Sequence, residues 1–129
     1  MKLVFNPFTV SLDWVQNPLV SVGIAFDGMG VVVEATSNGF YVVSFAGTIK
    51  EWFVVADQSG SCVVDVKRNG TSIVGGGGNK PTLSTAQRAN AVPSGWTSVA
   101  IAAEDELEFV VDSCSTITRI QVFLTVEKA

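Results

Sequence analysis

Two stretches near the C-terminus decide the fold of this chain: ELEFVVD at residues 106–112 and RIQVFLTV at residues 119–126. In each stretch large apolar residues fall at every second position, which is the repeat of a β-strand with one buried face. The two inward rows consist of Leu107, Phe109, Val111, Ile120, Val122, Leu124 and Val126. This two-residue period predicts two neighbouring strands and an all-β protein.

Two outward positions of these stretches are also large and apolar, Val110 in the first and Phe123 in the second. A third stretch, Lys50–Asp57, is apolar on both faces, and Phe53 and Val55 share one of them. A strand with two apolar faces is central in a sheet or is covered by another surface. Clustered apolar side chains on a surface mark interaction sites. We therefore expect a subunit interface at Val110, Phe123, Phe53 and Val55.

The composition favours a protein that associates with other chains. Of the 129 residues, 47% are apolar and 16% are charged, whereas an ordinary soluble domain has about 25% charged residues. Such a chain has few charged side chains to cover the surface of a monomer, so we expect a homo-oligomer. No apolar run approaches the roughly 18 residues of a membrane span. The net charge of −4, with scattered basic residues, predicts no binding to nucleic acid.

The first 18 residues differ from the rest of the chain. Phe5, Phe8, Leu12 and Trp14 crowd into a segment that two Asn-Pro pairs interrupt. A residue before proline favours extended backbone, so we expect an extended apolar arm. It is either an edge strand of the same domain or an anchor on a neighbouring molecule. The first Asn-Pro also interrupts the apolar core that a signal peptide needs, which favours assembly in the cytoplasm.

From residue 19 to residue 129, apolar stretches alternate with turn residues at the short intervals of a β-sandwich. Lys50–Asp57 and Ser61–Lys67 are expected as two strands joined by a turn. Ser84 and Gln87 have the spacing of a capping box and predict one short helix within Pro81–Ala91. About eight strands with one short helix predict a jelly-roll-like antiparallel β-sandwich that follows the N-terminal arm.

Residues able to carry catalysis are scarce. The chain has no histidine, which removes the commonest general base and zinc ligand. The densest carboxylates are Glu104, Asp105, Glu106 and Glu108; such groups can serve glycoside hydrolysis or calcium binding, but here they are typical of a solvated turn. Gly75–Gly78 lacks the Gly-Lys-Ser/Thr ending of a phosphate-binding loop. We expect no enzyme, no catalytic residue, no metal and no cofactor.

Two cysteines are present, Cys62 and Cys114. Both stand where small buried apolar residues fit, and the chain lacks a recognisable secretion signal. We expect free thiols, although the pair could also be joined.

Short motifs spread over most of the chain form a further pattern: Phe5–Thr9, Trp52–Ser61, Val64–Val66, Pro81–Ser84, Gly95–Thr97, Phe109–Ser113 and Ser115–Arg119. Together they resemble a small β-sandwich module that is common in structural proteins of tailed bacteriophages. The chain departs from that module at Val10, where the module has glycine, and at Glu104-Asp105, where it has a Gly-Asp turn. None of the motifs is a catalytic signature.

The resemblance implies a virion component, often trimeric, that sits on a capsid or a tail. We expect a non-enzymatic capsid decoration (cement) protein that binds the major capsid protein or other virion proteins and stabilises the shell. It would assemble in the host cytoplasm and reside in the virion. The arm is expected to anchor on the capsid through Phe5, Phe8, Leu12 and Trp14.

The alternative is a tail-fibre or baseplate module that binds a glycan on the host surface. Aromatic faces beside carboxylates and amides are the usual sugar platforms in such sandwiches. Trp96 near Asn90, or Trp14 with Asp13, would supply one here. A single tryptophan after a glycine turn is more often part of a core or an interface.

Overall fold

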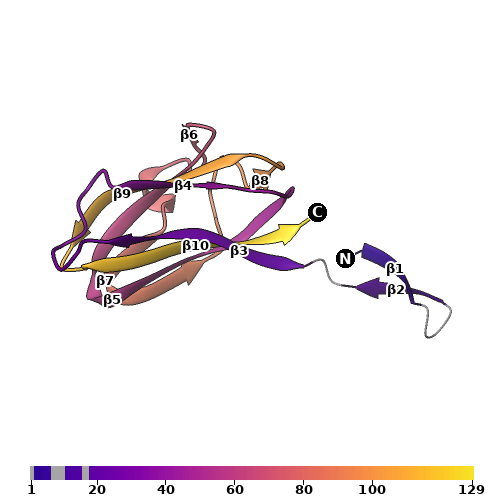
Figure 1. Cartoon of the computed structure of the whole chain (residues 1–129), viewed down its shortest axis with the longest axis horizontal. Helices are drawn as coiled ribbons and strands as arrows, with labels where there is room; N and C mark the ends of the chain where they lie inside the picture. The colour runs from indigo at the N-terminus through magenta and orange to yellow at the C-terminus, as the bar shows by residue number, and fades with distance from the viewer. Residues whose placement is uncertain (1, 7–10, 16–17) are drawn as a thin grey trace.

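The fold is all-β and antiparallel, with a barrel or sandwich-like arrangement of strands (Figure 1). The computed structural model describes residues 2–6, 11–15 and 18–129. Its strands are β1 (Lys2–Asn6), β2 (Ser11–Val15), β3 (Leu19–Asp27), β4 (Asn38–Val42), β5 (Gly47–Arg68), β6 (Thr71–Ser72), β7 (Thr82–Ala91), β8 (Ala100–Ile101), β9 (Glu106–Ser115) and β10 (Arg119–Lys128). A short 3-10 helix spans Gly77–Asn79. The prediction of an all-β protein is confirmed.

Strand β5 organises the larger sheet. Eight strands form this sheet along the path β3-β10-β5-β9-β4, and β6, β7 and β8 also pair with β5. The first half of β5, Gly47–Ala56, pairs with β10, and the second half, from Ser61 to Arg68, pairs with β9. β5 therefore runs from one layer, with β3 and β10, into the other, with β9 and β4.

The two strands expected at residues 50–57 and 61–67 are one strand of 22 residues. The pairing of β5 with β7 shifts register on both sides of Gly60, which marks a bend in the strand. A Cβ at Gly60 would lie 2.7 Å from the carbonyl oxygen of Ser115 and 2.8 Å from Cγ1 of Ile117. Glycine therefore allows the bend to lie close to the β9–β10 connection. The prediction of a turn at residues 58–60 was wrong, because β5 continues through these residues.

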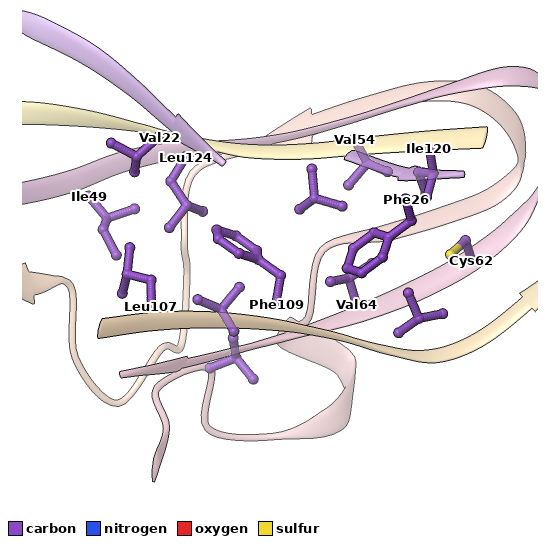
Figure 2. Close-up of a cluster of buried hydrophobic side chains, with 14 of the residues drawn as sticks. Val22, Phe26, Ile49, Val54, Cys62, Val64, Leu107, Phe109, Ile120 and Leu124 are labelled. Carbon is purple, nitrogen blue, oxygen red and sulfur yellow. The ribbon is translucent and has the colours of Figure 1, made fainter. Parts of the chain in front are cut away.

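Both predicted inward rows lie in the hydrophobic core. Six of their seven side chains are 0% exposed, and Ile120 is 2% exposed. Phe109 and Leu107 from β9 point toward Leu124 from β10, so the core lies between the two layers (Figure 2). Burying one such side chain contributes roughly 1.5–3 kcal/mol, which explains why these rows determine the fold.

β9 and β10, expected to be neighbours, do not pair with each other. They are consecutive in the sequence, but β5 separates them in the sheet, because β10 pairs with β3 and β5 while β9 pairs with β5 and β4. The turn between them contains Thr116 at a φ of 73° and leads from one layer to the other. As a consequence, Val110 and Phe123 face outward from different layers.

The helix expected within Pro81–Ala91 is also wrong, because Thr82–Ala91 forms β7 along the edge of β5. The pairing of β7 with β5 contains register shifts, and Thr85 has a φ of 49°. These irregularities change which residues of β7 point toward the core. Leu83, Ala86 and Ala89 consequently contact the core at intervals of three, the spacing of one helical face. Gln87 closes no capping box: its Nε2 donates to the carbonyl oxygen of Ala56 at 3.3 Å.

The N-terminal segment folds back on itself as a hairpin instead of forming a single extended arm. β1 and β2 pair in an antiparallel two-stranded sheet that is separate from the larger one. Figure 1 shows this hairpin beyond the end of the larger sheet, where β3 begins. The strands are extended, as Asn-Pro favours, but each finds its hydrogen-bond partner in the other.

Candidate interaction surfaces

Three of the four predicted interface residues meet on one outer surface. Phe53 of β5 lies opposite Phe123 of β10, and Val55 lies two residues further along the same face of β5. The Phe53 and Phe123 rings stack at a centroid separation of 4.8 Å and an interplanar angle of 5°. They point outward, because Val54 and Val122 beside them are 0% exposed.

Two cross-strand rows define this surface, which we call the β5–β10 face. One row is Gly23–Phe123–Phe53–Asn90 and the other is Ala25–Gln121–Val55–Arg88, each crossing β3, β10, β5 and β7. The stacked rings lie between two shallow hollows. The first is lined by Ser21, Gly23, Tyr41, Gln121 and Phe123, and the second by Phe53, Val55, Arg88, Ala89, Asn90 and Phe123. The rings therefore form a ridge with a recess on either side.

Gly23 keeps the first recess open. A Cβ at this position would lie 2.5 Å from both Cα and Cβ of Phe123 and 2.2 Å from the carbonyl oxygen of Val122. Real Cβ atoms do not approach other atoms so closely, so β3 and β10 tolerate only glycine at this crossing. The absence of a side chain there leaves one flank of Phe123 uncovered.

The β5–β10 face has charged side chains of both signs, namely Arg88, Arg119, Asp27, Glu51 and Asp57. Arg88 and Arg119 are exposed, and within residues 18–129 neither forms an ion pair. The nearby carboxylates of Glu51 and Asp57 are engaged in hydrogen bonds. Glu51 accepts from the Asn90 side chain at 2.8 Å. Asp57 accepts from the hydroxyl and amide of Thr118 and from the amide of Arg119; these bonds, led by that of the hydroxyl, lower its pKa.

The fourth predicted residue, Val110, lies on the outer surface of the other layer, which we call the β4–β9 face. It pairs with Asn38 of β4. Further along the same face Phe40 pairs with Glu108 and Val42 with Glu106. Phe40 is 56% exposed and Val42 is 62% exposed. This surface thus combines open apolar side chains with two carboxylates, and Lys67 of β5 lies opposite Glu108.

Phe40 and Val42 were not predicted as interface residues. Their signal is present in the sequence, because Phe40-Tyr41-Val42-Val43 is apolar on both faces, the criterion that selected Phe53 and Val55. Tyr41 belongs to the opposite row of β4 and is 37% exposed, whereas Val43 is fully buried.

The expected anchor residues belong to the hairpin, apart from Phe8, which lies outside the described residues. In the pairing of β1 with β2, Phe5 lies opposite Leu12 and Leu3 lies opposite Trp14. Residues that are opposite each other, or two apart along a strand, share one face of a sheet. Leu3, Phe5, Leu12 and Trp14 therefore belong to one face of the hairpin, which we call the hairpin face.

The residues considered for sugar binding have structural partners. The indole Nε1 of Trp96 donates to the carbonyl oxygen of Asn79 at 2.8 Å, and the side chain packs against the core. Asn90 is engaged with Glu51. Trp14 and Asp13 lie next to each other in β2 and so belong to opposite faces of the hairpin.

The carboxylates at residues 104–108 organise a turn. Asp105 accepts hydrogen bonds from the amide of Ala102 at 2.8 Å and from the side chain of Asn69 at 3.0 Å. These two bonds lower the pKa of Asp105, with a further contribution from Arg68. Glu108 accepts from Asn38 at 2.8 Å. Across the described part of the chain, no group of three or more cysteine, aspartate or glutamate side chains has the arrangement of a metal site.

The glycine run at residues 75–78 packs against the loop that precedes β8. A Cβ at Gly75, whose φ is 79°, would lie 2.7 Å from the carbonyl oxygen of Gly95. Asn79 donates to that same oxygen at 3.1 Å. The glycines therefore allow a close contact between two loops.

None of the helices in the described residues is long and apolar enough to cross a membrane. Comparison of the chain with protein-family models, with curated proteins and with solved structures finds no match. The two outer faces and the hairpin face are thus the features from which a function can be argued.

Proposed function

We propose that this protein is a non-enzymatic structural protein of a bacteriophage virion, a trimeric capsid decoration protein that binds and stabilises the capsid shell. The observation that carries the proposal is the presence of apolar side chains on the outer surface of both layers, at Phe53 and Phe123 on one and at Phe40 and Val42 on the other. The resemblance to phage sandwich modules supplies the setting.

Two unlike apolar surfaces suit a ring of identical subunits. In a cyclic trimer one surface of each subunit contacts a different surface of the next, whereas a twofold dimer uses one surface twice. The β5–β10 face offers a ridge flanked by recesses, and the β4–β9 face offers side chains that protrude into solvent. Arg88 on the first also complements Glu106 on the second, and such complementarity favours one pairing of surfaces over others.

The hairpin supports attachment to the shell. A two-stranded sheet alone is marginally stable in water at best, and four apolar residues belong to one face of this one. Contact with another surface would remove the apolar face from water and would stabilise the pairing of the two strands. We assign the hairpin to the major capsid protein and the two outer faces to sister subunits.

Capsid binding tests this assignment. The full chain and a chain lacking residues 2–17 are mixed with purified capsids that lack the protein, and bound copies are counted after sedimentation. We expect the full chain to bind in hundreds of copies per particle, and the shortened chain to remain trimeric without binding. Unchanged binding by the shortened chain would contradict the anchor.

The glycan-binding alternative gives a different result in the same preparation. A tail or baseplate module would be present in few copies per virion and would show saturable quenching of tryptophan fluorescence by sugars. A decoration protein shows no such response. Quenching without capsid binding would therefore replace the proposed function with the alternative.

A further inference from the structure

The two cysteines of the chain face each other across neighbouring strands. Cys62 of β5 is the register partner of Cys114 of β9, and both are free thiols. In an antiparallel pair, opposite residues share one face and their Cα atoms are about 4.5 or 5.5 Å apart. Disulfides join Cα atoms that are roughly 4.4–6.8 Å apart. The backbone therefore already has the spacing of a cross-strand disulfide.

The two thiols differ in their access to solvent. Cys62 is 1% exposed and lies at one end of the buried cluster (Figure 2). Burial, together with the neighbouring Cys114 thiol, raises the pKa of Cys62. Cys114 is partly exposed, near the turn between β9 and β10, with its Sγ 4.0 Å from the carbonyl oxygen of Ile117. A reagent in solution reaches Cys114 before it reaches Cys62.

We propose that Cys62 and Cys114 form an oxidisable dithiol that closes into a cross-strand disulfide when the protein meets a small-molecule disulfide. The Cys114 thiolate attacks one sulfur of the reagent, which forms a mixed disulfide and releases one small thiol. Cys62 then attacks Sγ of Cys114, and its proton passes to the second small thiol, which is released. Two protein thiols are oxidised and one reagent disulfide is reduced.

Closure would fasten β5 to β9 within one layer. The two cysteines enclose about 50 residues of chain, and a cross-link across a loop of that length restricts the unfolded state strongly. The same protein would hold thiols in a reducing compartment and a disulfide outside it. This inference is independent of the proposed function, because it requires only the pairing of β5 with β9.

The experiment exposes the folded full-length protein to oxidised glutathione at pH 8 and follows intact mass, thiol content and melting temperature. We expect each chain to lose the mass of two hydrogen atoms and both titratable thiols, without any cross-link between chains. The melting temperature should rise by about 5 °C or more, and dithiothreitol should reverse both changes.

The C114S variant is the matched control, because Cys114 is partly exposed and serine is close to cysteine in size. It should retain the Cys62 thiol under the same treatment, and its melting temperature should not rise. Three outcomes overturn the proposal: both thiols survive in the wild-type chain, the reaction stops at a glutathione adduct on Cys114, or the disulfide joins two chains.

Discussion

The two outer faces cover their apolar side chains to different extents. On the β5–β10 face, Phe53 and Phe123 stack on each other and are half-buried within the chain. On the β4–β9 face, Phe40 and Val42 remain 56% and 62% exposed. The first face is flanked by strands on both sides, whereas β4 ends the path of the sheet. A central position supplies cross-strand neighbours to an apolar side chain, and an edge position leaves it uncovered.

This difference indicates how the two faces would behave in an assembly. A ring pair that is already stacked loses little side-chain freedom on binding, so it is a preorganised surface. Phe40 and Val42 lose more exposed area when they are covered, so they gain more from burial. The preorganised ridge on one subunit would therefore complement the exposed Phe40 and Val42 on the next.

The largest expected effect is loss of the proposed trimer when either face is changed. The F123S variant alters only the ridge, and the F40S/V42S variant alters only the edge. Each should weaken association roughly a hundredfold, the scale of losing a central apolar contact. Size-exclusion chromatography with light scattering should find monomers of both, while V92S, which changes an exposed apolar residue in a loop, should remain a trimer.

Mixing the two variants sharpens the comparison further. Each variant retains one intact face, and these faces are of opposite kinds, so an equimolar mixture should form dimers with one chain of each. A twofold interface predicts no such rescue. If the wild-type chain is a monomer, or grows into open filaments with concentration, the closed trimer is contradicted.

A smaller effect is expected from G23A, which adds a methyl group beside Phe123. The new Cβ would overlap Cα and Cβ of Phe123, and relieving the overlap should displace β3 or β10. We expect a loss of roughly 1–3 kcal/mol in the free energy of unfolding, as for other overpacked sites. G78A serves as the control for a general effect of replacing glycine, because Gly78 has no positive φ and has open space around its Cβ. Equal losses in the two variants, measured by urea denaturation, would show that the Phe123 flank is not tightly packed.

The sequence predicts the two faces of a strand better than it predicts its neighbours. The period of two placed Leu107, Phe109 and Val111 in the core and Phe53 and Phe123 outside it, because alternation is a property of a single strand. Pairing depends on the whole sheet. The sequence predicts β9 and β10 as neighbours because they are consecutive, whereas β5 lies between them in the sheet.

Irregular pairing accounts for the other differences. Bulges along β5 and β7 change the interval between inward residues from two to three, so that Leu83, Ala86 and Ala89 imitate a helical face. Gly60 looks like a turn residue, yet it allows a bend within one long strand. A local pattern contains no information about these offsets, because a bulge is a property of the pairing of two strands and not of one segment.

A still smaller effect, on association, is expected from the charges that border the two faces. R88Q removes a basic group beside Val55 and leaves the apolar ridge unchanged. We expect trimer dissociation constants roughly two- to fivefold higher at low salt, the size of a peripheral ion pair, and little difference from wild type at high salt. Analytical ultracentrifugation at several salt concentrations measures this change. K50Q, a charge-matched substitution at another exposed position, should not reproduce it; an effect of R88Q that is independent of salt would contradict the charge pairing.

The smallest effect concerns acid stability, where one aspartate near each face takes part. The pKa of Asp57, near the β5–β10 face, is lowered mainly by the Thr118 hydroxyl, and the pKa of Asp105, near the β4–β9 face, is lowered mainly by the Ala102 amide. A carboxyl with a lowered pKa in the folded state stabilises the fold above its unfolded pKa of about 3.8, and this contribution disappears as pH falls through the folded value. D57N and D105N should therefore melt slightly below wild type at pH 7, with the difference shrinking below about pH 4. Melting curves of both variants between pH 7 and pH 2 measure it, and E34Q, which changes an exposed carboxyl outside both hydrogen-bond groups, is the control. A difference that stayed constant down to pH 2 would show that the lost contacts stabilise the fold without any contribution from the carboxylate charge.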